Sequence, residues 1–243
     1  GSSADVSQFA IIADTNRRTK MAIVSKAVVP DAALIDPRTL TTLAPYQIAC
    51  TGMDALTHAI EAYVSTAHSP ITDLHALEAI RLITANLPGA VASPASIDYQ
   101  GAMMLASLEA GLAFSNAILG AVHAMAHSMG GYLDLPHGEC NAILLTGVVA
   151  FNYPACPERY DRIAEAMGLS LTGLDSQAKA GLLVRTIASL REKVGISPTV
   201  GRLGVKKTDL PRLAEFAMQD ACMATNPMLM SKQEIEAIYE EVL

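Results

Sequence analysis

The sequence predicts a mainly α protein, in which a helical bundle follows a short β hairpin and one further strand. Apolar residues recur at helical spacing almost without interruption from about residue 43 to the end. Residues 1–40 differ, because short apolar runs alternate there with polar turns. The chain has 243 residues, of which 51% are hydrophobic, so it can bury a sizeable core.

The β part is predicted within the first forty residues. The runs FAIIAD and MAIVS flank the polar turn TNRRTK, which is typical of a hairpin, and AALID is expected to add one more strand. A hairpin and one strand are too few for an independently stable sheet. We therefore expect residues 1–42 to be a remnant of a larger α/β domain, and residues 43–243 to form an all-helical domain.

Capping and breaking signals divide the helical part. PYQIACTGMDALTHAIEAYVS predicts helices on both sides of a break at Gly52, and SPITDLHALEAIRLITANL opens with Ser69 as N-cap and Pro70 as first helical residue. SIDYQGAMMLASLEAGLAF predicts the next helix, and HAMAHSMGG is expected to end at its glycine pair. Ser231 and Glu234 are spaced as a capping box for the last helix. Further helices are expected at about 138–152, 157–167, 175–194, 208–222 and 232–242.

Charge and composition exclude several classes of protein. The net charge is −7 and no Lys/Arg cluster exceeds two or three residues, so no nucleic-acid partner is expected. No uninterrupted apolar run reaches the roughly 18 residues of a membrane span, and residues 1–9 do not have the pattern of a signal peptide. We therefore expect a cytoplasmic protein with no membrane contact. Its four cysteines are expected to stay reduced: Cys50, Cys140, Cys156 and Cys222.

The six histidines are concentrated between His58 and His137. DALTH places Asp54 and His58 four residues apart, HAMAH does the same for His123 and His127, and PHG supplies His137. Residues i and i+4 share one face of a helix, so Asp54 and His58 can bind one ion while His123 reaches it from another helix. Carboxylate and imidazole ligands suit Zn²⁺, Fe²⁺ and Mn²⁺.

A plainer interpretation stands beside the metal site. A single Asp-x-x-x-His pair is usually a solvated or hydrogen-bonded pair, and His127 lies among Ala and Met residues where a core histidine is common. HAMAH is not the metalloprotease signature, because Ala124 stands where that signature has its glutamate. His68 and His75 are interpreted as surface or capping residues. The residues alone leave both interpretations of the other histidines open.

Three long motifs, GMDALTHAIEAYVS, GLAFSNAILGAVHAMAHSMGG and PHGECNAILL, resemble the iron-containing (group III) alcohol dehydrogenase family. The resemblance covers essentially the whole chain. It implies an oxidoreductase that transfers hydride between a small alcohol or aldehyde and NAD or NADP. In this family an N-terminal α/β domain binds the dinucleotide, and a C-terminal helical domain of the dehydroquinate synthase-like type holds Fe²⁺ or Zn²⁺. A homo-oligomer remains open.

The resemblance also implies roles for individual residues. Four match the metal ligands: Asp54, His58, His123 and His137. His127 matches a histidine that stands beside the substrate without binding the metal, which implies a catalytic role. Phe114 and Cys222 match positions that line the substrate pocket. Three residues match the hairpin region that touches the dinucleotide: Ser2, Ser7 and Lys20.

The sequence departs from the family pattern at several points. The residues GSSAD stand where the family has GTGSE, and Ser3 replaces the Gly that is common there. Thr146 stands where the family commonly has Pro, and Met228 follows the residues NP where the family commonly has Arg. The family's glycine-rich phosphate loop lies upstream of residue 1. We therefore expect these 243 residues to bind a divalent metal, to bind NAD(P)H weakly, and to show little dehydrogenase activity alone.

Two other functions stay open at this point. One is a metal-binding helical module without catalysis of its own, natural or truncated. The other is a lyase related to dehydroquinate synthase, against which the full HAMAH…PHG pattern argues.

Overall fold

The protein, described over residues 3–243 of a computed structural model, is mainly helical, as the sequence predicts. Short 3-10 turns join several of its helices. The α-helices are α1 (Pro45–Val64), α2 (Pro70–Ala92), α3 (Ile97–Ala117), α4 (Ala121–Leu133), α5 (His137–Asn152), α6 (Pro157–Ala166), α7 (Ser176–Lys193), α8 (Leu210–Gln219) and α9 (Lys232–Glu241).

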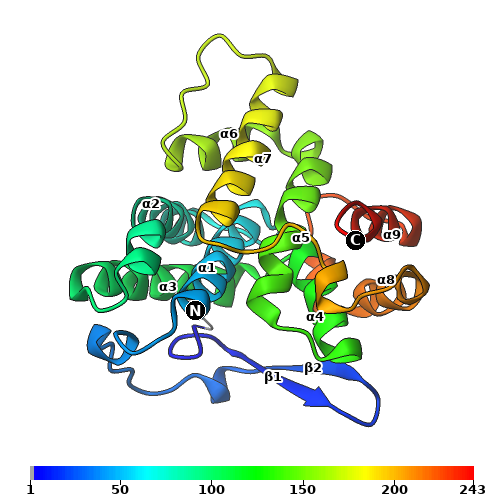
Figure 1. Ribbon diagram of the computed structural model, residues 1–243, viewed down its shortest axis with the longest axis horizontal. Helices are drawn as coiled ribbons and strands as arrows, with labels where there is room; N and C mark the ends of the chain where they lie inside the picture. Colours follow the sequence, from blue (N-terminus) through cyan, green and yellow to red (C-terminus); the bar gives the residue numbers. More distant parts are fainter. Residues whose placement is uncertain (1–2) are drawn as a thin grey trace.

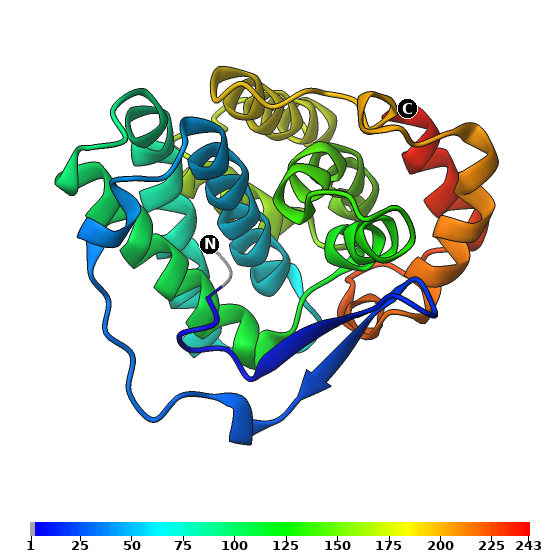
Figure 2. The same ribbon diagram turned by 60° about the horizontal axis from the view of Figure 1, so that its bottom comes forward.

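Helix α1 lies at the centre of the bundle (Figures 1 and 2). It packs against α2 and α3 on one side and against α5 on the other. Helix α4 packs against α5 and α8, and α8 in turn packs against α9. Every α1 residue from Gly52 to Val64 is buried, and Asp54 and Glu61 are the two acidic side chains of this segment, which holds no Lys or Arg. Any polar side chain on this part of α1 is therefore held away from bulk water.

The predicted hairpin is confirmed, but the predicted third strand is wrong. Strands β1 (Phe9–Asp14) and β2 (Thr19–Val24) pair antiparallel, with Phe9 opposite Val24. AALID, residues 32–36, is an irregular segment in which Leu34 is 94% exposed. A strand needs a neighbouring strand to bond its backbone groups, and no described strand lies beside this segment. The hairpin itself crosses the end of α4, where β2 packs on the helix (Figure 2).

The predicted break at Gly52 is also wrong, because α1 runs without interruption from Pro45 to Val64. A Cβ atom at Gly52 would lie 2.3 Å from Cδ1 of Leu87 in α2. Glycine is therefore present because α1 and α2 approach closely at this point, and not because the helix ends there.

The glycine pair of HAMAHSMGG does not end its helix either. Helix α4 continues through Gly130 to Leu133, and Asp134 takes the left-handed conformation (φ 56°) that ends it. A Cβ at Gly130 would lie 2.9 Å from Nζ of Lys20. This glycine accommodates the hairpin lysine, so its role is again one of close packing.

The expected capping residues are confirmed. Ser69, the residue before Pro70, accepts a hydrogen bond from the Thr72 N–H, and Ser231 forms the capping box with Glu234. The expected helix 208–222 is shorter at its end: Asp220 leaves helical conformation and its side chain caps the 3-10 turn Ala221–Thr225.

The four cysteines are free thiols. Within residues 3–243 no single helix is long and apolar enough to cross a membrane, and only α3 and α4 taken together, bent by 98°, meet that test by length and composition.

Candidate metal centre

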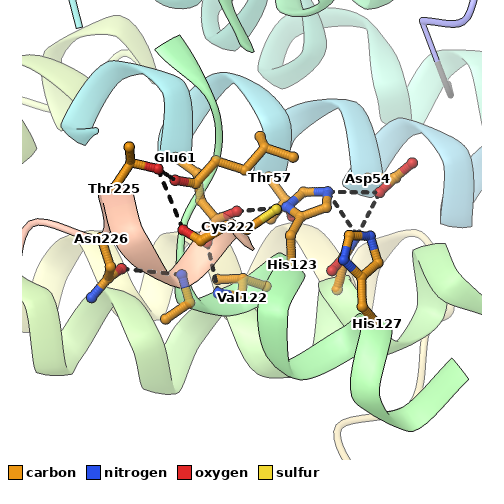
Figure 3. Close-up of polar contacts among 12 residues, drawn as sticks. Asp54, Thr57, Glu61, Val122, His123, His127, Cys222, Thr225 and Asn226 are labelled. Atoms are coloured by element: carbon orange, nitrogen blue, oxygen red, sulfur yellow. Dashed lines mark hydrogen bonds and ion pairs between the residues drawn. The ribbon is translucent and has the colours of Figure 1, made fainter. Parts of the chain in front are cut away.

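Helix α1 presents three acidic or imidazole side chains on one buried face. Asp54, His58 and Glu61 are spaced i, i+4 and i+7, so they follow one another along the helix and face α4. Figure 3 shows Asp54 and Glu61 pointing from α1 toward His123. All three α1 side chains are buried. Sequence reasoning found the first two and missed Glu61, although its spacing in DALTHAIE was the available signal.

Helices α4 and α5 complete the cluster. Oδ1 of Asp54 lies 3.7 Å from Nε2 of His123 and 3.6 Å from Nε2 of His137. One ligand atom from each of Asp54, His58 and His123 lies within 4.8 Å of the others. Ligand atoms bound at about 2.0–2.2 Å around a tetrahedral ion are separated by roughly 3.4 Å. Asp54, His58 and His123 therefore come together at spacings close to those of a metal site, and His137 joins them through its contact with Asp54.

The hydrogen bonding of the cluster also fits a cation. Nδ2 of Asn141 lies 2.6 Å from Asp54 Oδ1, 3.2 Å from His123 Nε2 and 3.1 Å from His137 Nε2, so three candidate ligand atoms surround one amide group. An amide NH₂ has only two hydrogens for them. Among the described residues, Nδ1 of His58 and Nδ1 of His137 are buried with no hydrogen-bond partner. A set of buried acceptors with too few donors is the arrangement that a divalent ion satisfies.

Electrostatics separate the four candidate ligands. Burial lowers the pKa of His58 to about 3 and holds the pKa of His137 well below its usual value, so both imidazoles are neutral near pH 7. Burial opposes ionisation of Asp54, yet the surrounding histidines hold its pKa below the usual range. Neutral imidazole and ionised carboxylate are the forms that bind metals.

His123 differs because two carboxylates flank it. Burial alone lowers the pKa of His123, but Glu61 and Asp54 raise it to about 9 in the metal-free chain. Its Nδ1 lies 2.5 Å from Oε2 of Glu61, and its Nε2 faces Asp54. An ion that binds Nε2 therefore displaces a proton from this ring.

A cavity of about 540 Å³ opens beside the cluster. The candidate ligands line it together with Phe114 and Cys222, which sequence analysis assigned to the substrate, and with Ser7 and Lys20, which it assigned to the dinucleotide. The ring of Phe114 stacks on His58 with centroids 4.4 Å apart. Ser2, the third hairpin residue of that set, lies outside the described residues.

His127 lies one turn beyond His123 on α4 and lines the same cavity. Its ring centroid is 5.9 Å from that of His123 and 5.2 Å from that of His137. Nδ1 of His127 lies 2.9 Å from Oδ2 of Asp220, in the segment that follows α8. Sequence reasoning missed Asp220, because 93 residues separate the two and no local pattern links them. Burial opposes ionisation of Asp220, but the bond from His127 keeps its pKa low.

The remaining histidines lie away from the cavity. His68 is exposed, with Nδ1 3.3 Å from Asp73, and half-buried His75 pairs with Glu109 at 2.5 Å. Neither residue is among those that line the cavity.

Comparisons with known proteins show which family the chain is similar to. The sequence profile of the Fe-containing alcohol dehydrogenase family, C-terminal, matches residues 48–243. The chain is 42% identical over 241 residues to 1,3-propanediol dehydrogenase of Klebsiella pneumoniae, covering 99% of this chain and 62% of that protein. It is 37% identical over 243 residues to NAD-dependent methanol dehydrogenase of Bacillus methanolicus, covering 100% and 64%.

Solved structures give the same result. The crystal structure of a 1,3-propanediol oxidoreductase superposes with a TM-score of 0.97 at 42% identity, covering 100% of this chain and 64% of that one. An alcohol dehydrogenase from Oenococcus oeni superposes with a TM-score of 0.97 at 37% identity, covering 100% and 63%. The chain thus spans a little under two thirds of the length of these relatives.

Proposed function

Because the chain belongs to the Fe-containing alcohol dehydrogenase family, we propose that it is the metal-binding part of a metal-dependent NAD(P) alcohol dehydrogenase. The observation that carries the proposal is the convergence of Asp54, His123 and His137 around one buried point at the wall of a cavity. The hairpin forms another wall of that cavity, so a dinucleotide held by the hairpin side would meet a substrate held at the cluster.

Four residues would hold the ion, Fe²⁺ or Zn²⁺: Asp54, His58, His123 and His137. One carboxylate and three neutral imidazoles leave a divalent site with a net positive charge. When bound there, such an ion acts as a Lewis acid that favours the alkoxide of a substrate over the neutral alcohol.

The cavity itself would bind and orient a small alcohol or aldehyde. Phe114 and Cys222 give it apolar surface next to the cluster, where the carbon chain of the substrate would lie. Ser7 and Lys20, on the hairpin side, would contact the dinucleotide. Hydride transfer between the substrate carbon and the nicotinamide is the cofactor's chemistry, and the protein contributes position and the exclusion of water.

His127 would move the hydroxyl proton. Oxidation of an alcohol sends a hydride to NAD(P)⁺ and releases one proton, which needs an acceptor near the substrate oxygen. His127 lines the cavity beside the cluster, and Asp220 orients its ring by accepting a hydrogen bond from Nδ1. An imidazole so oriented is suited to take the proton and release it outward.

We also propose a domain organisation and a cellular location for the protein. We assign residues 1–42 to the nucleotide-binding part of the whole protein and residues 43–243 to the metal-binding part, because the described strands β1 and β2 pair only with each other, whereas the chain from Pro45 onward is helical. We place the protein in the cytoplasm, where its free thiols stay reduced.

A zinc titration of the 243-residue chain by calorimetry tests the metal site. One site per chain is expected, and Asp54→Asn and His123→Gln should abolish it. The matched control is His68→Gln, which removes an exposed histidine that already lies beside a carboxylate and should leave binding unchanged. Equal zinc affinity in wild type and both site variants would refute the proposal.

A second assay separates the enzyme from a metal-binding module. The whole protein is supplied with NAD(P)⁺ and a short-chain alcohol, and reduced cofactor is followed by its absorbance. Turnover that disappears in Asp54→Asn supports the dehydrogenase. Zinc binding without turnover of any alcohol supports the module instead.

A further inference from the structure

We propose that Glu61 is a positioning residue, which sets the tautomer of His123 and at the same time caps helix α4. The inference rests on the proposed function, because it concerns how His123 is presented to the metal. Glu61 lies within the motif GMDALTHAIEAYVS but is not one of the predicted ligands, and the residue is 3% exposed.

Each oxygen of the Glu61 carboxylate has its own partner on α4. Oε1 accepts the backbone N–H of Val122 at 2.6 Å, and Oε2 lies 2.5 Å from Nδ1 of His123. Figure 3 shows the carboxylate between these two groups, with His123 continuing toward Asp54. One side chain of α1 thus holds both the start of α4 and the ring that α4 presents to the cluster.

Helix α4 depends on this contact because it has no local cap. Its N-cap position is Gly120, which has no side chain to accept the first N–H groups. Side chains from elsewhere replace it: Asn226 accepts from Ala121 N–H at 3.1 Å, and Glu61 accepts from Val122. The positive end of the helix dipole also favours the buried carboxylate.

The glycine is needed to admit these two caps. A Cβ at Gly120 would lie 2.9 Å from Oε1 of Glu61 and 3.0 Å from Oδ1 of Asn226. The backbone of Gly120 and the two side chains therefore form one packed unit. Its arrangement brings the carboxylate to Nδ1 of His123 and leaves Nε2 of the ring facing Asp54.

The contact decides which ring nitrogen can bind a metal. A carboxylate only accepts hydrogen bonds, so Nδ1 of His123 must carry the hydrogen in the contact with Glu61. Nε2, which faces Asp54, is then the nitrogen that supplies a lone pair to an ion. Carboxylate–histidine pairs of this kind fix both the orientation and the tautomer of a ligand.

Glu61→Gln reverses this preference at almost constant size. The Val122 N–H can only donate, so the glutamine oxygen must face it, and the glutamine NH₂ then faces Nδ1 of His123. An NH₂ group donates, which favours His123 with its hydrogen on Nε2. That hydrogen occupies the lone pair that an ion requires.

The experiment measures zinc affinity by competition with a chelator in four chains: wild type, Glu61→Gln, Glu109→Gln and Asn226→Ser. Glu109→Gln is the matched control, because Glu109 also pairs with a histidine Nδ1 at 2.5 Å, but at half-buried His75, which does not line the cavity. We expect Glu61→Gln to weaken zinc binding about 10- to 100-fold, and Glu109→Gln to leave it unchanged.

Asn226→Ser separates capping from ligand positioning. It weakens the neighbouring cap of α4 without touching His123, so we expect a lower melting temperature with near wild-type zinc affinity. A second readout is the proton NMR signal of Nδ1–H in zinc-loaded, ¹⁵N-histidine-labelled protein. One slowly exchanging signal of this kind should be lost in Glu61→Gln and kept in Glu109→Gln.

The outcomes are distinguishable from failure of the proposed function. Wild-type chain that does not bind zinc overturns the metal site, and this inference falls with it. Wild-type chain that binds zinc while Glu61→Gln binds equally well overturns only the inference. If Glu61→Gln does not fold, Glu61→Asp replaces it, since the shorter acid withdraws the carboxylate by one methylene; undiminished zinc affinity in that variant has the same meaning.

Discussion

Replacing Gly52 by alanine is expected to destabilise the protein, although alanine is the better helix former. Gly52 lies within α1, two residues before Asp54, and its added Cβ would lie 2.3 Å from Cδ1 and 3.1 Å from Cδ2 of Leu87. Leu87 is 0% exposed, so its methyl groups can move only into other core side chains. The clash must therefore be relieved by distorting α1, α2 or the leucine rotamer.

The magnitude follows from two opposing contributions. Alanine gains about 1 kcal/mol over glycine in a helix interior. Overpacking a filled core costs about 1–3 kcal/mol, so Gly52→Ala should lower the free energy of unfolding by about 0–2 kcal/mol. Leu87→Ala leaves a cavity and should cost about 2–5 kcal/mol. In that background the new Cβ meets no methyl group, and Gly52→Ala should become stabilising by about 1 kcal/mol.

Denaturant unfolding of wild type, both single variants and the double variant measures this coupling. Gly101→Ala in α3 is the control, because its Cβ would meet only Pro37 at 3.9 Å and the substitution should simply stabilise the helix. If Gly52→Ala changes stability by the same amount with and without Leu87, the two residues are not in conflict and the explanation of this glycine is wrong.

Three further results are expected. Gly138→Ala should be more damaging than Gly52→Ala, because its Cβ would lie 2.6 Å from the backbone oxygen of Cys50, which cannot rotate away; a melting temperature equal to that of wild type would contradict this. Lys179→Met should lower stability by about 0.5–1 kcal/mol at pH 7 and by less at pH 3. Burial opposes ionisation of Asp161, but its bond to Lys179 at 2.6 Å holds the pKa of Asp161 below its unfolded value. The stabilisation from this ion pair is therefore present above about pH 4 and is lost as the pH falls. Thermal melts of wild type and variant at pH 7 and pH 3 measure it, and an equal loss of stability at both pH values would count against the pairing. His127→Ala should lower turnover of the whole enzyme while metal content, measured by atomic absorption, stays constant; loss of the metal would mean that His127 is a ligand.

The helices were predictable because their signals are local. Ser69 with Pro70, and Ser231 with Glu234, act on backbone groups within one turn, so their meaning does not depend on the rest of the molecule. The Asp54–His58 pair is equally local, since helical spacing alone places both side chains on one face of α1.

The glycines and the third strand were not predictable in the same way. A glycine inside a helical pattern can end the helix or admit a neighbour, and only the position of Leu87 against Gly52, or of Lys20 against Gly130, decides between these. AALID has the composition of a strand, but a strand forms only where another strand bonds to it.

The sequence by itself determined the helical architecture and the residues that can act as metal ligands, because helical periodicity and residue chemistry are properties of short segments. Only the tertiary structure decided how those ligands are held. Helical spacing places Glu61 on the ligand face of α1, but only the packing of α4 brings His123 to it across 62 residues, and Asp220 reaches His127 across 93 residues with no local pattern. Such contacts arise when separate helices pack, and a buried carboxylate must then find its hydrogen-bond donors wherever the packing places them.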